Sequence, residues 1–235
     1  MQLFFDAGRA YLTYSCPWSE DPRVYIQPID PEKGSALGPA SVLYAGAHTG
    51  ARLLKCAGWY YLIVDSDISD EPGQDVAANA DIVATTACTR IFRSRSHPFT
   101  GAFTGDEFAA CPANPILWNG EHPEVRGCSR LSLVRGERGW TAIFHAIRGQ
   151  MVDKTSACNP LTLSVFAPLP LGHETYMANA LWKDGWPVIN GAEPVGVTGD
   201  AEGMRWLPEV DEFEDAFLGG ESARPDERAI IEFIY

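Results

Sequence analysis

The sequence predicts an all-β protein built from repeated antiparallel hairpins. Short apolar and aromatic runs are separated by turns that contain glycine, and they do not alternate with long helical patterns. A unit of strand, glycine turn and aromatic-rich strand recurs three times along the chain. This recurrence favours propeller blades only weakly, because a β-sandwich gives similar local signals.

The three predicted hairpins follow one another in the order expected for consecutive blades. Given as strand, turn and strand, they are residues 3–5, 6–8 and 10–14; residues 52–55, 56–58 and 59–64; and residues 132–134, 135–139 and 140–145. Glycine suits these turns because tight hairpin turns need backbone angles that other residues adopt at a cost.

Composition and charge limit the classes of partner. The chain has 235 residues and a formal net charge of -13, which opposes binding to phosphate backbones and to anionic membrane surfaces. We therefore expect no nucleic-acid partner and no membrane partner. Abundant Trp and Tyr suit a small-molecule ligand, either a sugar or an apolar metabolite. The sequence as written predicts a cytoplasmic protein, whereas a leader lost from a longer precursor would indicate secretion.

The cysteine and acidic patterns do not predict a metal site or a cofactor. The six cysteines lack CxxC spacing, and we expect free buried thiols at Cys16, Cys56, Cys88, Cys111, Cys128 and Cys158. The spacing of Asp65, Asp67 and Asp70 lacks the glycine and the terminal glutamate of a calcium loop, which favours a solvated acidic loop. Residues 66–86 form a long connection that either caps a site or is disordered.

Several longer segments carry a family resemblance. They are LFFDAGRAYL at 3–12, GWYYL at 58–62, IFRSRS at 91–96, NPIL at 114–117, the strand at 140–148, PLGHETY at 170–176 and WKDGWPVIN at 182–190. In this order they resemble family 43 glycoside hydrolases, which hydrolyse xylosides and arabinosides. The resemblance implies a five-bladed propeller, of which residues 1–195 supply about three blades. Residues 196–235 then form an extension with a linker and a terminal strand.

The resemblance also implies a mechanism based on a base, a general acid and an aspartate that tunes the acid. The base belongs to the family's first blade, and the tuning aspartate would stand immediately before Met1. The general acid corresponds to Thr49, at the start of a segment similar to the family's EGPHLYK. A threonine hydroxyl cannot protonate a leaving alkoxide near neutral pH. We therefore expect family-type hydrolysis to be lost.

The expected ligand-binding residues are the positions that match the family's funnel. They are His173, Glu174, Arg148, Tyr176, Cys128 and Arg52. His173 stands where the family has an arginine, and Cys128 lies in the segment that matches its GHGDLV histidine. His48 and His145 could also supply acid–base chemistry, but we expect His145 to be a hydrogen-bonded blade residue.

Three functions remain open on this basis. The first is a pseudoenzyme or weak carbohydrate binder. The second is a pocket adapted to isomerise or cyclise a small apolar metabolite, with His173, Arg148 and Tyr176 as hydrogen-bond donors. The third is an active glycosidase completed by another chain. Because three blades leave apolar faces open, we also expect them to be covered by a second copy of the chain, by the tail strands, or through a different strand arrangement.

Overall fold

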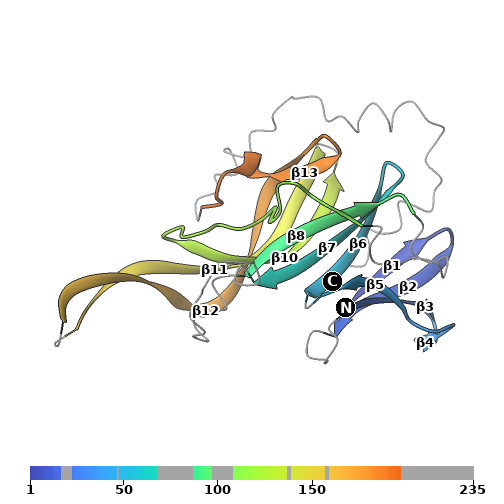
Figure 1. Cartoon of the computed structure of the whole chain (residues 1–235), viewed down its shortest axis with the longest axis horizontal. Coiled ribbons are helices and arrows are strands. Elements are labelled where there is room, and N and C mark those ends of the chain that lie inside the picture. The colour runs from blue at the N-terminus through green and yellow to red at the C-terminus, as the bar shows by residue number, and fades with distance from the viewer. Residues whose placement is uncertain are drawn as a thin grey trace.

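The computed structural model describes residues 1–16, 23–46, 48–67, 87–96, 108–136, 139–156 and 159–196. These residues form an all-β protein of three antiparallel sheets, each built from consecutive strands (Figure 1). The prediction of an all-β fold with about three propeller-like blades is confirmed. No α-helix occurs in these ranges, and the one helical element is a 3-10 turn, η3 (Asn190–Ala192).

The strands divide into three sheets that follow the chain in order. Sheet A contains β1 (Gln2–Asp6), β2 (Arg9–Cys16), β3 (Arg23–Asp30), β4 (Ser35–Ala36) and β5 (Ser41–Ala45). Sheet B contains β6 (Thr49–Cys56), β7 (Trp59–Asp67), β8 (Ala87–Ser94) and β9 (Ala109–Ala110). Sheet C contains β10 (Val125–Gly136), β11 (Gly139–Ser156), β12 (Asn159–Lys183) and β13 (Trp186–Ile189).

All three predicted hairpins are present. β1 pairs with β2, β6 with β7, and β10 with β11, each in antiparallel register. The first two turns place Ala-Gly pairs at positive φ, with φ of 48° at Ala7, 75° at Gly8, 47° at Ala57 and 75° at Gly58. Two successive residues at positive φ give the tight turn whose twist matches that of the flanking strands.

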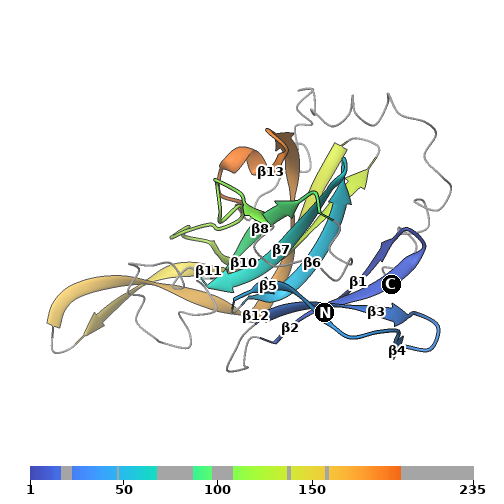
Figure 2. The ribbon, with the colours of Figure 1, turned by 45° about the vertical axis from the view of Figure 1, so that its right-hand side comes forward.

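Sheet B lies between the other two sheets and is covered on both faces, as Figures 1 and 2 show. Along β7, Tyr60, Leu62 and Val64 enter the core shared with sheet A, which we call the first core. Tyr61 and Ile63 point the other way, into the second core shared with sheet C. Alternate side chains of one strand therefore serve two cores, which explains why β7 reads as an unbroken apolar run.

The outer faces of sheets A and C carry exposed apolar side chains. On sheet A, Phe4 is buried while its neighbours Leu3 and Phe5 are 48% and 50% exposed. On sheet C, Ala178 is buried while Met177 is 58% exposed. Within the described ranges the three sheets do not close into a ring. That these faces are covered by another copy of the chain stays a prediction.

Polar contacts join the sheets where they meet. Asp6 of sheet A is buried, and its carboxylate accepts hydrogen bonds from Lys55 Nζ at 2.5 Å and from Tyr60 Oη at 2.7 Å, both in sheet B. Between sheets B and C, the Arg93 guanidinium lies over the rings of Trp59 and Trp186, 4.5 and 4.2 Å from their centroids. These contacts fix the relative position of neighbouring sheets.

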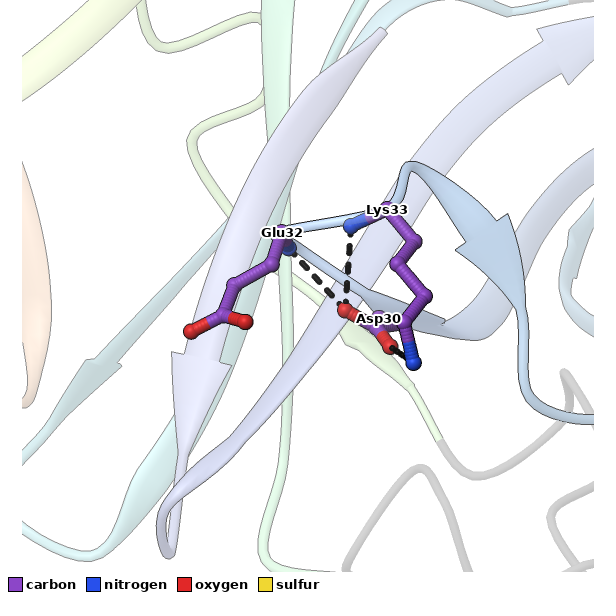
Figure 3. A network of polar contacts seen from close by, with 3 residues as sticks. All are labelled: Asp30, Glu32 and Lys33. Carbon is purple, nitrogen blue, oxygen red and sulfur yellow. Dashed lines mark hydrogen bonds and ion pairs between the residues drawn. The ribbon is translucent and has the colours of Figure 1, made fainter.

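The turn after β3 is held by a local side-chain network. The Asp30 carboxylate accepts hydrogen bonds from the backbone N–H groups of Glu32 and Lys33, at 3.0 and 3.1 Å (Figure 3). Lys33 Nζ also pairs with Asp30, at 3.4 Å. An aspartate that binds the backbone two and three residues ahead stabilises such a turn.

A long arm extends from sheet C and was not predicted. Beyond Gly149, β11 continues to Ser156 and pairs with the first part of β12, so that the hairpin projects away from the three sheets (Figure 1). Ile147 pairs with His173 but Gly149 pairs with Pro168, so β12 carries extra residues where the arm begins. Gly149 is required there, because a Cβ would collide with the Phe166 ring.

The predictions for the cysteines are confirmed only in part, because some of the residues concerned lie outside the described ranges. Five of the predicted free thiols are confirmed, with Cys56, Cys88, Cys111 and Cys128 buried and Cys16 half-buried. Cys158, most of the 66–86 connection and residues 197–235, with the expected linker and terminal strand, lie outside the described residues. No helix in the described part of the chain is long and apolar enough to span a membrane.

Candidate functional site

Thr49 begins β6 and pairs with Asp65 of β7 across the sheet. A β-bulge separates this pair from the next one, Arg52 and Ile63, and Gly50 in the bulge has a φ of 57°. A Cβ on Gly50 would collide with an oxygen of the Asp65 carboxylate. Gly50 therefore allows the bulge and leaves space for the carboxylate beside Thr49.

Asp65 is a buried carboxylate, which corrects the expectation of a solvated acidic loop. The strand continues past the apolar run to Asp67, so Asp65 lies inside β7 and is only 5% exposed. Its Oδ1 accepts a hydrogen bond from Thr89 Oγ1 at 3.0 Å and one from the Arg130 backbone N–H at 2.8 Å. Burial raises the pKa of this carboxyl, and these hydrogen bonds together with nearby Arg52 oppose the rise.

Arg52 of β6 and Arg130 of β10 act electrostatically both on Asp65 and on His145 of β11. His173 of β12 also acts on His145. We call these four basic side chains the basic cluster: Arg52, Arg130, His145 and His173. Arg52 Nη1 donates a hydrogen bond to the Leu131 carbonyl at 3.0 Å. Arg130 lies within the second of two register shifts of β10, with a φ of 57°. The rings of His145 and His173 lie 6.4 Å apart between centroids.

His145 differs from the expected hydrogen-bonded blade residue. Its imidazole forms no hydrogen bond with the described residues and lies among cationic groups instead. Burial lowers its pKa, and Arg130, His173 and Arg52 lower it further. The alternation of β11 directs His145 away from the second core, which Phe144 and Ala146 enter.

A second group of predicted residues lies on the opposite face of sheet C. The Arg148 guanidinium pairs with the Glu174 carboxylate at 2.7 Å, and Tyr176 Oη lies 3.5 Å from the other carboxylate oxygen. We call these three residues the Glu174 cluster. Tyr176 packs against the second core, with its ring 5.9 Å from that of Phe144. Because alternate residues of a strand face opposite sides, β12 separates His173 from Glu174.

Two other candidates, Cys128 and His48, belong to neither cluster. Cys128 is fully buried in the second core, where burial raises the pKa of its thiol to about 12. In this conformation the sulfur is not presented to a ligand. His48 packs against the rings of Tyr44 and Phe92, with centroids 5.4 and 6.2 Å away. In the described ranges, no three His, Cys, Asp or Glu side chains converge in a way that could hold a metal ion.

Neither the contacts of Asp65 with Thr89 and Arg130 nor a role for Arg130 in the site was predicted from the sequence. One signal for Asp65 existed, because it follows directly on the buried run that pairs with the segment beginning at Thr49. Arg130 gave no comparable signal. Its place depends on the two irregularities of β10, which the sequence of that strand does not mark.

No family model matches the chain, but curated proteins do. It is 26% identical over 206 residues to a xylosidase/arabinosidase of Butyrivibrio fibrisolvens, and 27% identical over 205 residues to a putative beta-xylosidase of Escherichia coli. These matches cover 80% and 82% of this chain but 33% and 34% of the relatives. The chain thus spans about a third of the length of the curated relatives it matches.

Solved structures agree on the fold. A GH43 protein from Bacillus licheniformis superposes with a TM-score of 0.57 and 24% identity, covering 83% of this chain and 32% of that one. A thermostable family-43 glycoside hydrolase superposes with a TM-score of 0.56 and 13% identity, covering 84% and 59%. In sequence the chain is similar to xylosidases and arabinosidases, and its fold is like that of family 43 glycoside hydrolases.

Proposed function

We propose that this chain is a carbohydrate-binding relative of family 43 glycosidases whose own residues do not carry out family-type hydrolysis. Thr49 is the observation that carries the proposal, because it occupies the position where the family resemblance calls for the general acid. General acid catalysis contributes roughly 10²- to 10⁴-fold to such reactions, and a threonine hydroxyl cannot replace a carboxylic acid in that role.

Neither Asp65 nor Glu174 is a ready substitute. Asp65 pairs with Thr49 across the sheet, but its Oδ1 already accepts two hydrogen bonds. Glu174 is committed to an ion pair with Arg148. Inverting hydrolysis needs an acid and a base roughly 6.5–9.5 Å apart, on opposite faces of the sugar. Two carboxylates that are both engaged in fixed contacts fit that requirement poorly.

Sugar binding is supported by the Glu174 cluster. Arg148, Glu174 and Tyr176 are part-buried and carry both donors and acceptors, the combination that fixes sugar hydroxyls. Their mutual contacts hold the side chains in place before a ligand arrives. Preorganisation of this kind lowers the entropy cost of binding.

The test combines turnover with binding on one purified preparation. We expect no release of nitrophenol from nitrophenyl β-xyloside or α-arabinofuranoside above the buffer rate. We also expect binding of xylo- or arabino-oligosaccharides by calorimetry, weakened about tenfold by Tyr176→Phe or Glu174→Gln, as the loss of a buried hydrogen bond implies. Lys33→Gln, at the exposed turn of sheet A, is the control.

Three results would count against the proposal. Turnover that is abolished by Glu174→Gln or Asp65→Asn would assign hydrolysis to this chain's own carboxylates. Turnover found only where a second chain co-elutes would favour a glycosidase completed by a partner. A hit confined to apolar metabolites would favour the isomerase or cyclase alternative instead.

A further inference from the structure

We propose that the basic cluster of Arg52, Arg130, His145 and His173 is a site for the carboxylate of an acidic sugar such as a uronic acid. This inference rests on the proposed sugar-binding function and adds a second contact to it, because the basic cluster lies on the opposite face of sheet C from the Glu174 cluster. The ligand class it names differs from the names of the relatives above, a xylosidase/arabinosidase and a putative beta-xylosidase.

Basic groups from four different strands converge at this cluster. Arg52, Arg130 and His173 all act electrostatically on His145, although they belong to β6, β10 and β12. Like charges brought together repel one another, and an anionic ligand bound among them relieves that repulsion.

Three side chains of the basic cluster have no hydrogen-bond or ion-pair partner among the described residues. With the described residues, the Arg130 guanidinium and the imidazoles of His145 and His173 form no hydrogen bond or ion pair. Among those residues, the carboxylate that acts on the two arginines is Asp65, which supplies a single negative charge. The donors of the cluster therefore remain available to a ligand.

The basic cluster is accessible. Arg130 and His173 are exposed, and His145 is half-buried. Buried Asp65 accepts a hydrogen bond from the Arg130 backbone, and Arg52 donates one to the Leu131 carbonyl. A guanidinium offers parallel N–H donors that match the two oxygens of a carboxylate, which favours a planar sugar carboxylate. Sulfate esters share the oxyanion chemistry and need to be compared directly.

The cluster also predicts the pH dependence of binding. His145 is faced by Arg130 of β10, Arg52 of β6 and His173 of β12. Burial and these three neighbours lower its pKa. A bound anion favours the protonated imidazole, so binding takes up a proton. Affinity should then be higher at pH 5.5 than at pH 8.

The experiment compares D-glucuronate, glucose 6-sulfate and neutral xylose on the full chain at pH 5.5 and pH 8, by calorimetry and by NMR of the histidine rings. We expect glucuronate to bind at least about tenfold more tightly than xylose at pH 5.5, with a smaller difference at pH 8. Arg130→Gln and His173→Gln should each remove most of that preference. Arg135→Gln is the matched control, because Arg135 is an exposed arginine of the same strand and the charge change is identical.

The outcomes separate this inference from the proposed function. If neutral sugars bind as tightly as glucuronate, or if Arg130→Gln weakens both equally, the inference is overturned while sugar binding stands. If glucose 6-sulfate binds more tightly than glucuronate, the oxyanion site stands and its ligand is a sulfated sugar rather than a uronate. If no sugar binds, both fail. A variant that loses stability is recognised by its melting temperature, and the pH dependence of the wild type then decides the question.

Discussion

Thr49 and Asp65 are paired across the β6–β7 ladder, with Gly50 leaving room for the Asp65 carboxylate. A hydroxyl thus stands at the general-acid position of the family resemblance, and a carboxylate stands one strand away. The carboxylate is buried and accepts hydrogen bonds from Thr89 and from the Arg130 backbone. Because Thr89 belongs to β8 and Arg130 to β10, these hydrogen bonds link Asp65 of β7 to two other strands. The carboxylate therefore helps to position those strands.

Gly50→Ala tests the close approach at this pair. The variant adds a steric collision with Asp65 to the strain of positive φ, so we expect it to lose at least about 3 kcal/mol of unfolding free energy. Gly58→Ala is the matched control, because Gly58 has a φ of 75° and nothing near its Cβ position. It should lose only about 1 kcal/mol. Urea denaturation measures the unfolding free energy of both variants. If Gly50→Ala and Gly58→Ala lose equal amounts, the Asp65 side chain has moved to avoid the collision.

Asp65→Asn tests the charge of the buried carboxyl. Asn retains an oxygen for Thr89 and the Arg130 N–H, but it cannot ionise. Because the folded pKa of Asp65 lies above the ordinary 3.8, the folded protein holds this proton more tightly than the unfolded chain. The wild type should therefore lose stability relative to the variant as the pH rises above about 3.8. The loss amounts to roughly 1.4 kcal/mol for each unit of pKa difference. A stability difference that does not change between pH 3 and pH 7 would contradict the raised pKa.

Thiol reactivity tests the burial of Cys128. With its pKa raised to about 12 and its side chain in the second core, Cys128 should react with an alkylating reagent only through unfolding. Cys16, which is half-buried, should react first. Mass spectrometry of peptides after a short exposure at pH 8 identifies the labelled positions. Early labelling of Cys128 would contradict its burial and would show that its thiol is accessible to a ligand.

Arg93→Lys tests the junction of sheets B and C. Arg93 lies over Trp59 and Trp186 and donates hydrogen bonds to the Gly185 carbonyl at 2.6 Å and the Asp184 carbonyl at 3.1 Å. Lysine keeps the charge but lacks the planar group that stacks and donates at once, so we expect a loss of about 1–2 kcal/mol. Arg95→Lys, which affects a single stacking contact on Trp59, should cost less. Losses of similar size would contradict the bridging role of Arg93.

The hairpins could be predicted from sequence because each is specified locally. In the turn at Ala57 and Gly58, a glycine and two flanking apolar runs are enough to define the pairing. The continuous run from Tyr60 to Val64 was also visible, but that its side chains alternate between two cores depends on the neighbouring sheets.

The site was predictable only where it repeats a family motif. Arg148 and Glu174 were found in this way, and the structure brings them together. The position of Asp65 and the grouping of Arg130 with His145 depend on β-bulges and on contacts between distant strands. The arm beyond Gly149 was missed because its residues carry no turn signal that distinguishes a projecting hairpin from a loop.

We propose that Thr49 leaves this chain without a general acid. The most direct test is the turnover of nitrophenyl β-xyloside and α-arabinofuranoside by the purified wild type, measured beside Glu174→Gln and Asp65→Asn. We expect no turnover above the buffer rate for any of the three proteins, with sugar binding retained by the wild type. Sustained turnover by the wild type that disappears in either carboxylate variant would contradict it.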